Sequence, residues 1–410
     1  MPSVVLDGDP VPSDGTLPET SVAGAGQRPF GVYVHVPFCV TRCGYCDFNT
    51  YTASELHSAD GEATASRETY ADLAIAEIRF ARQVLGTVDV PVRTVFIGGG
   101  TPTLLPAEDL GRVLAAIGEE FGLEPDAEVT TEANPETVDP DYLRRLRANG
   151  YTRVSFGMQS ARQHVLRVLD RTHTPGRPEQ CVAWAREAGF DHVNLDLIYG
   201  TPGETDDDWH ASLRAAIDAD PDHVSAYSLI VEEGTRLAAR VRRGELSETD
   251  GDTLADRYLA AEHALTEAGF HCYEVSNWAR GTAARSRHNR LYWTGGDWWG
   301  VGPGAHSHVG GTRWWNVKHP AAYAARLADG VSPGQAREVL DASDQRFERI
   351  LLELRIAEGC PLELLDDDGR AAAVRAVADG LLDPRAHARG RAVLTLRGRL
   401  LADAVVRDLT

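Results

Sequence analysis

The feature that most constrains the fold is a repeated alternation of strand-like and helix-like segments. Six short runs rich in β-branched and aromatic residues are separated by segments whose apolar residues recur at helical spacing. The strand-like runs span residues 31–36, 92–97, 127–133, 153–159, 192–200 and 223–229. Sustained alternation predicts right-handed βαβ units around a parallel sheet. Six units are fewer than the eight of a closed barrel, so we predict an α/β fold with an open, partial (β/α)6 barrel.

Polar residues gather where these strands end. Cys39 follows the first strand, and the turn GGGTPT at 98–103 follows the second. The later strands end at Glu132, at Gln159, at Asp196 and Tyr199, and at Ser225 or Tyr227. Because ligands bind at the carboxyl ends of parallel strands, these side chains are expected to meet at one mouth of the barrel.

Three of the six cysteines, Cys39, Cys43 and Cys46, form a C-x3-C-x2-C pattern. Thiolates suit zinc or an iron–sulfur cluster. Structural zinc sites normally close four ligands, and the chain offers no second cysteine pair. A [4Fe-4S] cluster held by three cysteines would leave one iron open to a small chelating ligand. Zinc and three unrelated thiols are the alternatives, and Cys181, Cys272 and Cys360 are expected to be inert.

Composition predicts four segments along the chain. Residues 1–29 are rich in Pro, Gly, Ser, Asp and Thr and are expected to form a flexible leader before a core of residues 30–270. The segment 271–335 carries five of the eight tryptophans between residues 293 and 315, interleaved with glycines, which predicts a largely irregular segment with flat apolar surfaces. Residues 336–410 predict a small, winged-helix-like α+β domain of amphipathic helices.

The charge balance excludes several classes of function. A net charge of -20, with 11 Arg against 13 Asp and Glu in residues 341–410, argues against nucleic acid as a partner. The N-terminus has no basic start followed by an apolar stretch, and no apolar run is long enough to predict a membrane span. We therefore expect a cytoplasmic protein.

The cysteine pattern after the first strand, with Tyr45 just before Cys46, resembles the signature of radical S-adenosylmethionine (SAM) proteins. The stretches YVHVPFC, IGGGTPT, VSFGMQS, LDRTH and NLDLIYGTPGET resemble the branch that contains the oxygen-independent coproporphyrinogen III oxidases. The resemblance covers about residues 31 to 407. It implies a TIM-like radical SAM barrel whose [4Fe-4S] cluster is held by Cys39, Cys43 and Cys46.

The same resemblance implies a SAM site beside the cluster. The residues that match the family's SAM-contacting positions are Tyr33, Tyr45, Gly99, Gly100, Thr101, Glu132, Gln159, Arg171 and Asp196. Carboxylates suit the SAM ammonium or ribose, and Arg171 suits the SAM carboxylate. Taken alone, a glycine run is more simply a turn, and the alternative for Arg171 is a surface ion pair.

One position departs from the porphyrinogen-oxidising members, which carry a further cysteine two residues after the third. This chain has Phe48 there. In addition, HNRLYW at 288–293 resembles the H-N-x-x-Y-W motif of haem-chaperone relatives, which implies His288 as a haem ligand. His306, His308 and His319 are nearby competitors.

The resemblance therefore implies a haem chaperone, with haem, SAM and a [4Fe-4S] cluster as cofactors. Its implied partners are haem-receiving apoproteins such as respiratory enzymes, with membrane-protein clients among the options, and an electron donor; a homodimer is left open. Whether the chain is an enzyme is left open too. The alternative is oxidative decarboxylation of coproporphyrinogen propionates by a SAM-derived radical.

Overall fold

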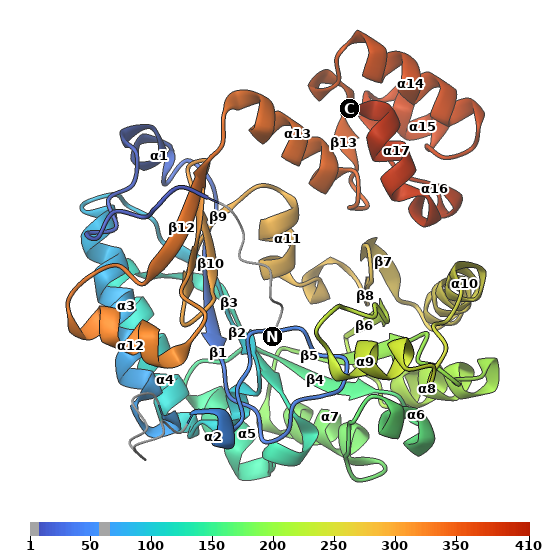
Figure 1. The fold of residues 1–410 in the computed structure, drawn as a ribbon. Coiled ribbons are helices and arrows are strands. Elements are labelled where there is room, and N and C mark those ends of the chain that lie inside the picture. Colours follow the sequence, from blue (N-terminus) through green and yellow to red (C-terminus); the bar gives the residue numbers. More distant parts are fainter. Residues whose placement is uncertain (1–7, 57–65) are drawn as a thin grey trace.

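The computed structural model describes residues 8–56 and 66–410, and within them twelve strands form one sheet in the order β12-β11-β10-β9-β1-β2-β3-β4-β5-β6-β8-β7 (Figure 1). Six neighbouring strands at its centre are parallel: β1 (Phe30–Val36), β2 (Val92–Gly99), β3 (Leu123–Ala133), β4 (Arg153–Gln159), β5 (His192–Tyr199) and β6 (His223–Ser228). The predicted (β/α)6 core is confirmed.

Helices follow the parallel strands and cover the outer face of the sheet (Figure 1). They are α3 (Arg67–Leu85), α4 (Ala107–Phe121), α5 (Pro140–Ala148), α6 (Gln163–Val168), α7 (Arg177–Ala188), α8 (Asp206–Asp218) and α10 (Gly251–Glu267), with shorter α2 (Ala53–Leu56) and α9 (Arg236–Arg242). Thr205 caps α8 in a capping box with Asp208, as expected of an N-terminal threonine. No helix in the described ranges is both long and apolar enough to cross a bilayer.

The aromatic segment is regular, which corrects the expectation of an irregular one. After β7 (His271–Glu274), β8 (Asn277–Ala279) and α11 (Arg287–Trp293), it forms β9 (Asp297–Val301), β10 (His306–Val309) and β11 (Thr312–Asn316), then α12 (Pro320–Ala328) and β12 (Gly334–Val339). Its glycines sit mainly at turns, while alternate residues such as Trp299, Val309 and Trp314 join the main core. The inward and outward alternation of side chains in these strands is hard to recognise in a glycine-rich sequence. The strands continue the sheet beyond β1.

Residues 8–29 lie against the sheet, which differs from the flexible leader expected there. Asp9 exchanges two backbone hydrogen bonds with Arg337 of β12, and the Ser332 N–H donates to the Ser13 carbonyl. α1 (Glu19–Gly24) places the Ser21 hydroxyl 2.7 Å from that of Thr312. These backbone contacts hold a segment whose composition alone resembles a linker.

The C-terminal unit is helical, with its own apolar core around Ile350, Leu354 and Leu382 (Figure 1). It contains α13 (Ala342–Glu353), α14 (Asp367–Ala378), α15 (Pro384–Ala388), α16 (Leu396–Leu400) and α17 (Ala402–Leu409), and β13 (Cys360–Pro361) pairs with β14 (Arg391–Ala392). The Ala357 N–H donates to the Tyr273 carbonyl of β7, so this unit covers the far edge of the sheet.

Candidate functional site

The cysteine loop leaves the carboxyl end of β1 and is anchored at several points. The Cys39 N–H donates to the Tyr51 carbonyl at 3.0 Å, and Gly44 bonds to both Leu169 and Leu237 through its backbone. A Cβ at Gly44 would lie 2.6 Å from an Asp170 carboxylate oxygen, so a larger residue there would displace the Asp170 side chain. The loop is thus held by backbone hydrogen bonds to Tyr51, to Leu169 at the end of α6 and to Leu237 in α9.

The three thiols of this loop interact with one another. Burial raises the pKa of Cys39 and raises that of Cys46 to about 11, and in both cases the neighbouring thiols add to the rise. In the described part of the chain, no three His, Cys, Asp or Glu side chains converge on a single ion. A cubane cluster takes each thiolate at a different iron, and the three cysteines of this loop could supply these ligands.

Arg171 lies beside the cysteines. One terminal guanidinium nitrogen is 3.5 Å from the Cys43 sulfur, and the other donates to the Gly157 carbonyl at 3.0 Å. Its Nε is buried and has no hydrogen-bond partner in the described structure. A buried guanidinium with an unused donor suits an anionic group such as a carboxylate. The donor set therefore fits a cluster with an adjacent carboxylate ligand.

Two carboxylates line the same mouth. Glu132 accepts a hydrogen bond from the Gly99 N–H at 3.0 Å, and Asp196 accepts from Ser155 at 2.8 Å and from Asn194 at 2.7 Å. Burial raises the pKa of Glu132 to about 8, with the Asp196 charge as a second cause, and burial also raises the pKa of Asp196. A cation or a hydroxyl donor bound beside these two carboxylates would offset the desolvation that raises their pKa values.

The remaining predicted residues surround this mouth. Tyr33 is 2.9 Å from the His35 ring, and Tyr45 is close enough for Cys43, Arg171 and Asp196 to influence its pKa, which burial raises. Gln159 has a left-handed φ of 64°, an uncommon conformation for a non-glycine residue that marks the end of β4 as constrained.

The glycines after β2 have a packing reason that sequence alone did not reveal. A Cβ at Gly99 would lie 2.6 Å from the His35 ring, and one at Gly100 would lie 2.5 Å from the Phe38 carbonyl. The Thr101 N–H donates to that same carbonyl. These residues therefore hold the loop after β2 tightly against β1.

His288 is buried inside the fold, with 1% of its surface exposed. Its Nδ1 is 2.9 Å from the Thr94 hydroxyl, its Nε2 is 2.7 Å from the Tyr292 hydroxyl, and its ring stacks on Phe96. Burial lowers the pKa of His288 to about 3, so the imidazole is neutral. In this conformation both ring nitrogens are engaged within the protein.

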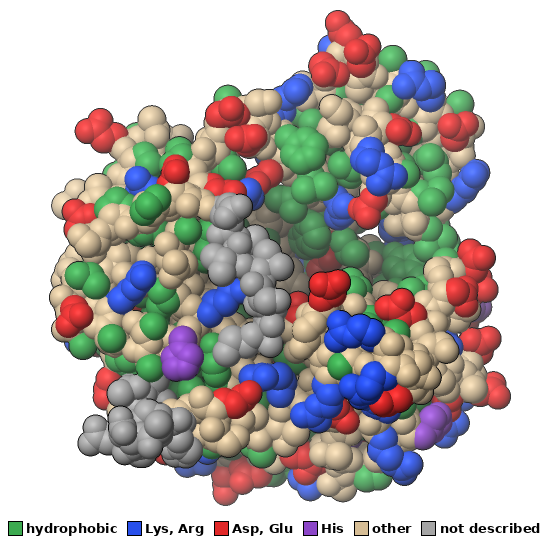
Figure 2. Space-filling view, viewed as in Figure 1, with side chains coloured by type: hydrophobic (Ala, Val, Ile, Leu, Met, Phe, Trp, Pro, Cys, Tyr) green, Lys and Arg blue, Asp and Glu red, His purple; other side chains and the backbone are tan. Residues whose placement is uncertain are grey.

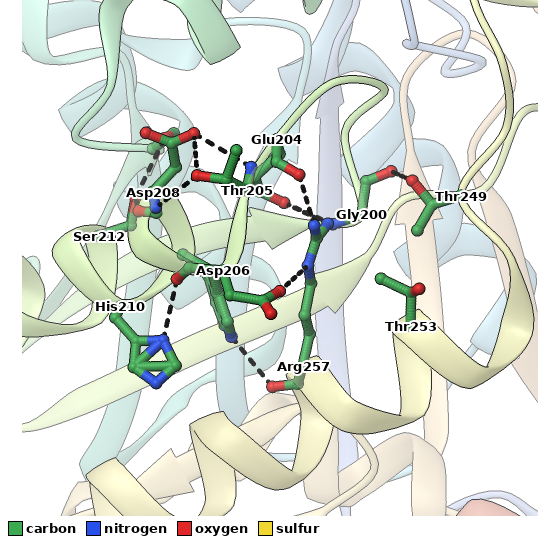
Figure 3. Close-up of polar contacts among 12 residues, drawn as sticks. Gly200, Glu204, Thr205, Asp206, Asp208, His210, Ser212, Thr249, Thr253 and Arg257 are labelled. Atoms are coloured by element: carbon green, nitrogen blue, oxygen red, sulfur yellow. Dashed lines mark hydrogen bonds and ion pairs between the residues drawn. The ribbon is translucent and has the colours of Figure 1, made fainter.

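A buried ion pair fixes the loop after β5 (Figure 3). The Glu204 carboxylate accepts from the Gly200 N–H at 2.8 Å and from Arg257 of α10 at 2.8 Å. The Thr249 hydroxyl donates to the Gly200 carbonyl. This loop directly continues β5, the strand that bears Asp196. The Glu204–Arg257 ion pair therefore also stabilises this part of the barrel mouth.

Sequence reasoning missed a polar network across the barrel interior. Asn194 contacts Ser155, Asp196 and Ser225, and its carbonyl oxygen is 2.6 Å from His223, which in turn contacts Tyr273. These residues lie in mid-strand, where polar side chains among apolar ones give little signal. Their alternation toward the inner face of β4, β5 and β6 was the available clue.

Comparison with known proteins also indicates a radical SAM protein. Residues 33–216 match the family model described as the radical SAM superfamily. The chain is 53% identical over 383 residues to the protein named heme chaperone HemW from Mycobacterium tuberculosis, covering 93% of this chain and 95% of the relative. It is 32% identical to the HemW of Bacillus subtilis, covering 80% and 83%.

The structure is similar to that of the coproporphyrinogen III oxidase HemN from Escherichia coli. The TM-score is 0.81 with 23% sequence identity, and the match covers 97% of this chain and 94% of HemN. At this identity the likeness defines the fold, a radical SAM barrel with a C-terminal helical region.

Proposed function

The chain belongs to the HemW family within the radical SAM superfamily, and on this premise we propose that it is a haem chaperone that also binds a [4Fe-4S] cluster and SAM. Haem would be delivered to haem-requiring apoproteins, including respiratory enzymes and membrane-bound clients. An electron donor would serve the cluster, and a homodimer is compatible with this role. Phe48, where porphyrinogen-oxidising members carry a cysteine, favours the chaperone over the oxidase.

The observation that carries the cofactor proposal is the position of Arg171 among the cysteines. Cys39, Cys43 and Cys46 would hold the cluster, and the buried Arg171 Nε would meet the SAM carboxylate. Cluster and SAM together supply one-electron radical chemistry when bound. Glu132 and Asp196 would bind the ammonium or ribose of SAM, and the remaining SAM residues would be Tyr33, Tyr45, Gly99, Gly100, Thr101 and Gln159.

For haem, the HNRLYW motif makes His288 the proposed ligand. Thr94 would orient the imidazole through Nδ1, as an outer hydrogen-bond partner commonly does for a metal-binding histidine. The Tyr292 hydroxyl now occupies Nε2, so iron ligation through Nε2 requires this hydrogen bond to open.

Asp196→Ala is expected to weaken SAM binding roughly 10- to 100-fold, because a hydrogen bond to a charged group contributes about 1.5–3 kcal/mol. The measurement is calorimetric titration of the anaerobically reconstituted protein with SAM. Asp207→Ala, at an exposed position on α8, is the control and should bind SAM normally. Unchanged affinity in Asp196→Ala together with an intact cluster spectrum would remove Asp196 from the site.

Haem titration tests the chaperone proposal. The anaerobically reconstituted protein should give a stoichiometric Soret band, and His288→Ala should weaken haem binding by about tenfold or more because it removes an iron ligand. In parallel, the protein is supplied with coproporphyrinogen III, SAM and a reductant. Formation of protoporphyrinogen without haem binding would favour the oxidase instead.

A further inference from the structure

Asn49, three residues after Cys46, joins the end of the cysteine loop to the base of the β10–β11 hairpin. Its side-chain amide nitrogen donates to two carbonyls, that of Pro303 at 3.0 Å and that of Lys318 at 2.7 Å. Pro303 precedes β10 and Lys318 follows β11, so this one amide bridges both ends of the hairpin. The end of the cysteine loop is thereby anchored on a segment that lies outside the parallel core.

The surroundings of this amide fit an asparagine. Gly304 has a left-handed φ of 73°, and a Cβ there would lie 2.7 Å from the Asn49 Nδ2. The Tyr51 hydroxyl lies 3.2 Å from the Asn49 Oδ1. The nitrogen of the amide therefore faces carbonyls and its oxygen faces a hydroxyl, which fixes its orientation. An aspartate of the same shape would place an oxygen against the two carbonyls.

The outer part of the cysteine loop is largely exposed. Val40 and Phe48 have 71% and 59% of their surface accessible to solvent. The molecular surface is also hollowed beneath the C-terminal unit, with apolar side chains on its walls (Figure 2). At the base of the loop, the Tyr51 N–H donates to the Pro37 carbonyl and the Cys39 N–H donates to the Tyr51 carbonyl. The placement of the three thiols therefore depends on how firmly this base is anchored.

The backbone of Asn49 also reaches the proposed SAM site. Its carbonyl accepts from the His35 Nε2 at 2.9 Å, so Nε2 carries the proton of this imidazole. Burial lowers the pKa of His35, which agrees with a neutral ring whose Nδ1 is an acceptor. The Tyr33 hydroxyl therefore donates to the His35 Nδ1 at 2.9 Å. This hydrogen bond fixes the direction of the Tyr33 O–H, and the oxygen can still accept from a ligand.

We propose that Asn49 is a positioning residue for the proposed cluster and SAM sites. Its side chain anchors the base of the cysteine loop on the β10–β11 hairpin, and its carbonyl orients the Tyr33 hydroxyl through His35. This inference rests on the proposed binding of the cluster and SAM, and it adds a residue that acts through others. It also makes the hairpin part of the support of the SAM site.

Asn49→Ala and the isosteric Asn49→Asp test this proposal in the anaerobically reconstituted full chain. Both variants keep the three cysteines and should take up a full complement of iron. SAM should bind about tenfold more weakly in calorimetric titration, because one hydrogen-bonding group of the site loses its fixed orientation. The change that SAM causes in the EPR spectrum of the reduced cluster should require correspondingly more SAM. Iron should also pass to a chelator about tenfold faster, because the base of the loop is released.

A double-mutant cycle tests the route through Tyr33. If Asn49 acts on SAM by orienting that hydroxyl, Asn49→Ala should weaken SAM binding by less than about threefold in a Tyr33→Phe background.

The matched control is Asn149→Asp. The Asn149 side-chain amide likewise donates to a carbonyl, that of Ala107 at 2.8 Å. It also lies beside a glycine, because a Cβ at Gly111 would be 2.7 Å from its Nδ2. Asn149 ends α5, on the outside of the barrel, so this variant should bind SAM and hold iron like the unaltered protein.

The outcomes separate the two proposals. If the unaltered protein takes up no cluster or binds no SAM, the proposed function is wrong and the role of Asn49 with it. If it binds both, and Asn49→Ala with normal circular dichroism binds SAM and holds iron equally well, the role of Asn49 alone is wrong. Asn49→Ala, which introduces no repulsion, decides this point if Asn49→Asp is unstable. An equal loss of SAM affinity with and without the Tyr33 hydroxyl would overturn the route through His35.

Discussion

Replacing Cys43 by alanine is expected to leave the anaerobically reconstituted protein without its iron–sulfur cluster. A cubane held by three thiolates cannot lose one without exposing a second iron to solvent, and the loop offers no replacement donor at that point. Iron and sulfide content should fall to the background level, and the broad absorption near ~400 nm that such clusters show should disappear. Cys39→Ala and Cys46→Ala should behave alike.

The matched control is Cys272→Ala, which removes a thiol that lies in β7, outside the cysteine loop. This variant should retain full iron content and the same spectrum. Full iron content in Cys43→Ala would instead show that the loop does not ligate the cluster, and the SAM proposal would fail with it.

Arg257→Ala should destabilise the fold by about 3–5 kcal/mol, because it leaves a buried carboxylate without its partner. Glu204 has no exposed side-chain surface, and the Arg257 side chain is only 6% exposed. Chemical denaturation at pH 9, where Glu204 of the unaltered protein is ionised, measures this loss through a comparison of midpoints. Loosening of the loop after β5 should also weaken SAM binding, since Asp196 lies on the same strand.

The pH dependence of the stability loss in Arg257→Ala identifies its cause. Burial raises the pKa of Glu204 from its ordinary 4.5 to about 7, against the opposing effect of Arg257. A raised folded-state pKa means that the ionised form disfavours folding, so the deficit of Arg257→Ala should be small near pH 4.5 and grow as the pH rises through 7. Adding Glu204→Gln should restore much of the stability, whereas a deficit independent of pH would contradict the ion-pair explanation.

A suitable surface control is Arg243→Ala. Arg243 pairs with Glu245 in the exposed turn that follows α9. Exposed ion pairs are screened by solvent, so the denaturation midpoint should not change measurably.

The parallel core was predictable because its strands and helices have distinct hydrophobic periods. The six runs ending near Val36, Ile97, Ala133, Gln159, Tyr199 and Ser228 all became strands. Strands β9 to β11 were not predicted, since glycine and tryptophan weaken an alternation that only the packing of Trp299 and Trp314 reveals. The order of residues 8–29 was not predicted, because their hydrogen bonds to residues 332–337 join parts of the chain that are far apart in the sequence; residues 1–7 of the expected leader lie outside the described residues.

The position of the candidate site followed from the rule that parallel strands bring their carboxyl ends together. The network of Ser155, Asn194 and His223 did not follow, because burial makes such residues look like ordinary core positions. The motif around His288 gave a residue type and a candidate role. It could not give the hydrogen bonds to Thr94 and Tyr292, which depend on strands and helices far apart in the sequence.

Both edge strands of the twelve-stranded sheet, β12 and β7, contact segments from outside the barrel. Asp9 bridges to Arg337 on one margin, and Ile356 bridges to Glu274 near the other. An uncovered margin would offer unpaired amides and carbonyls to another molecule, which is a common route to aggregation. Removing residues from either terminus for expression would therefore reduce solubility before it affected cofactor binding. A fusion partner is best joined through a long linker.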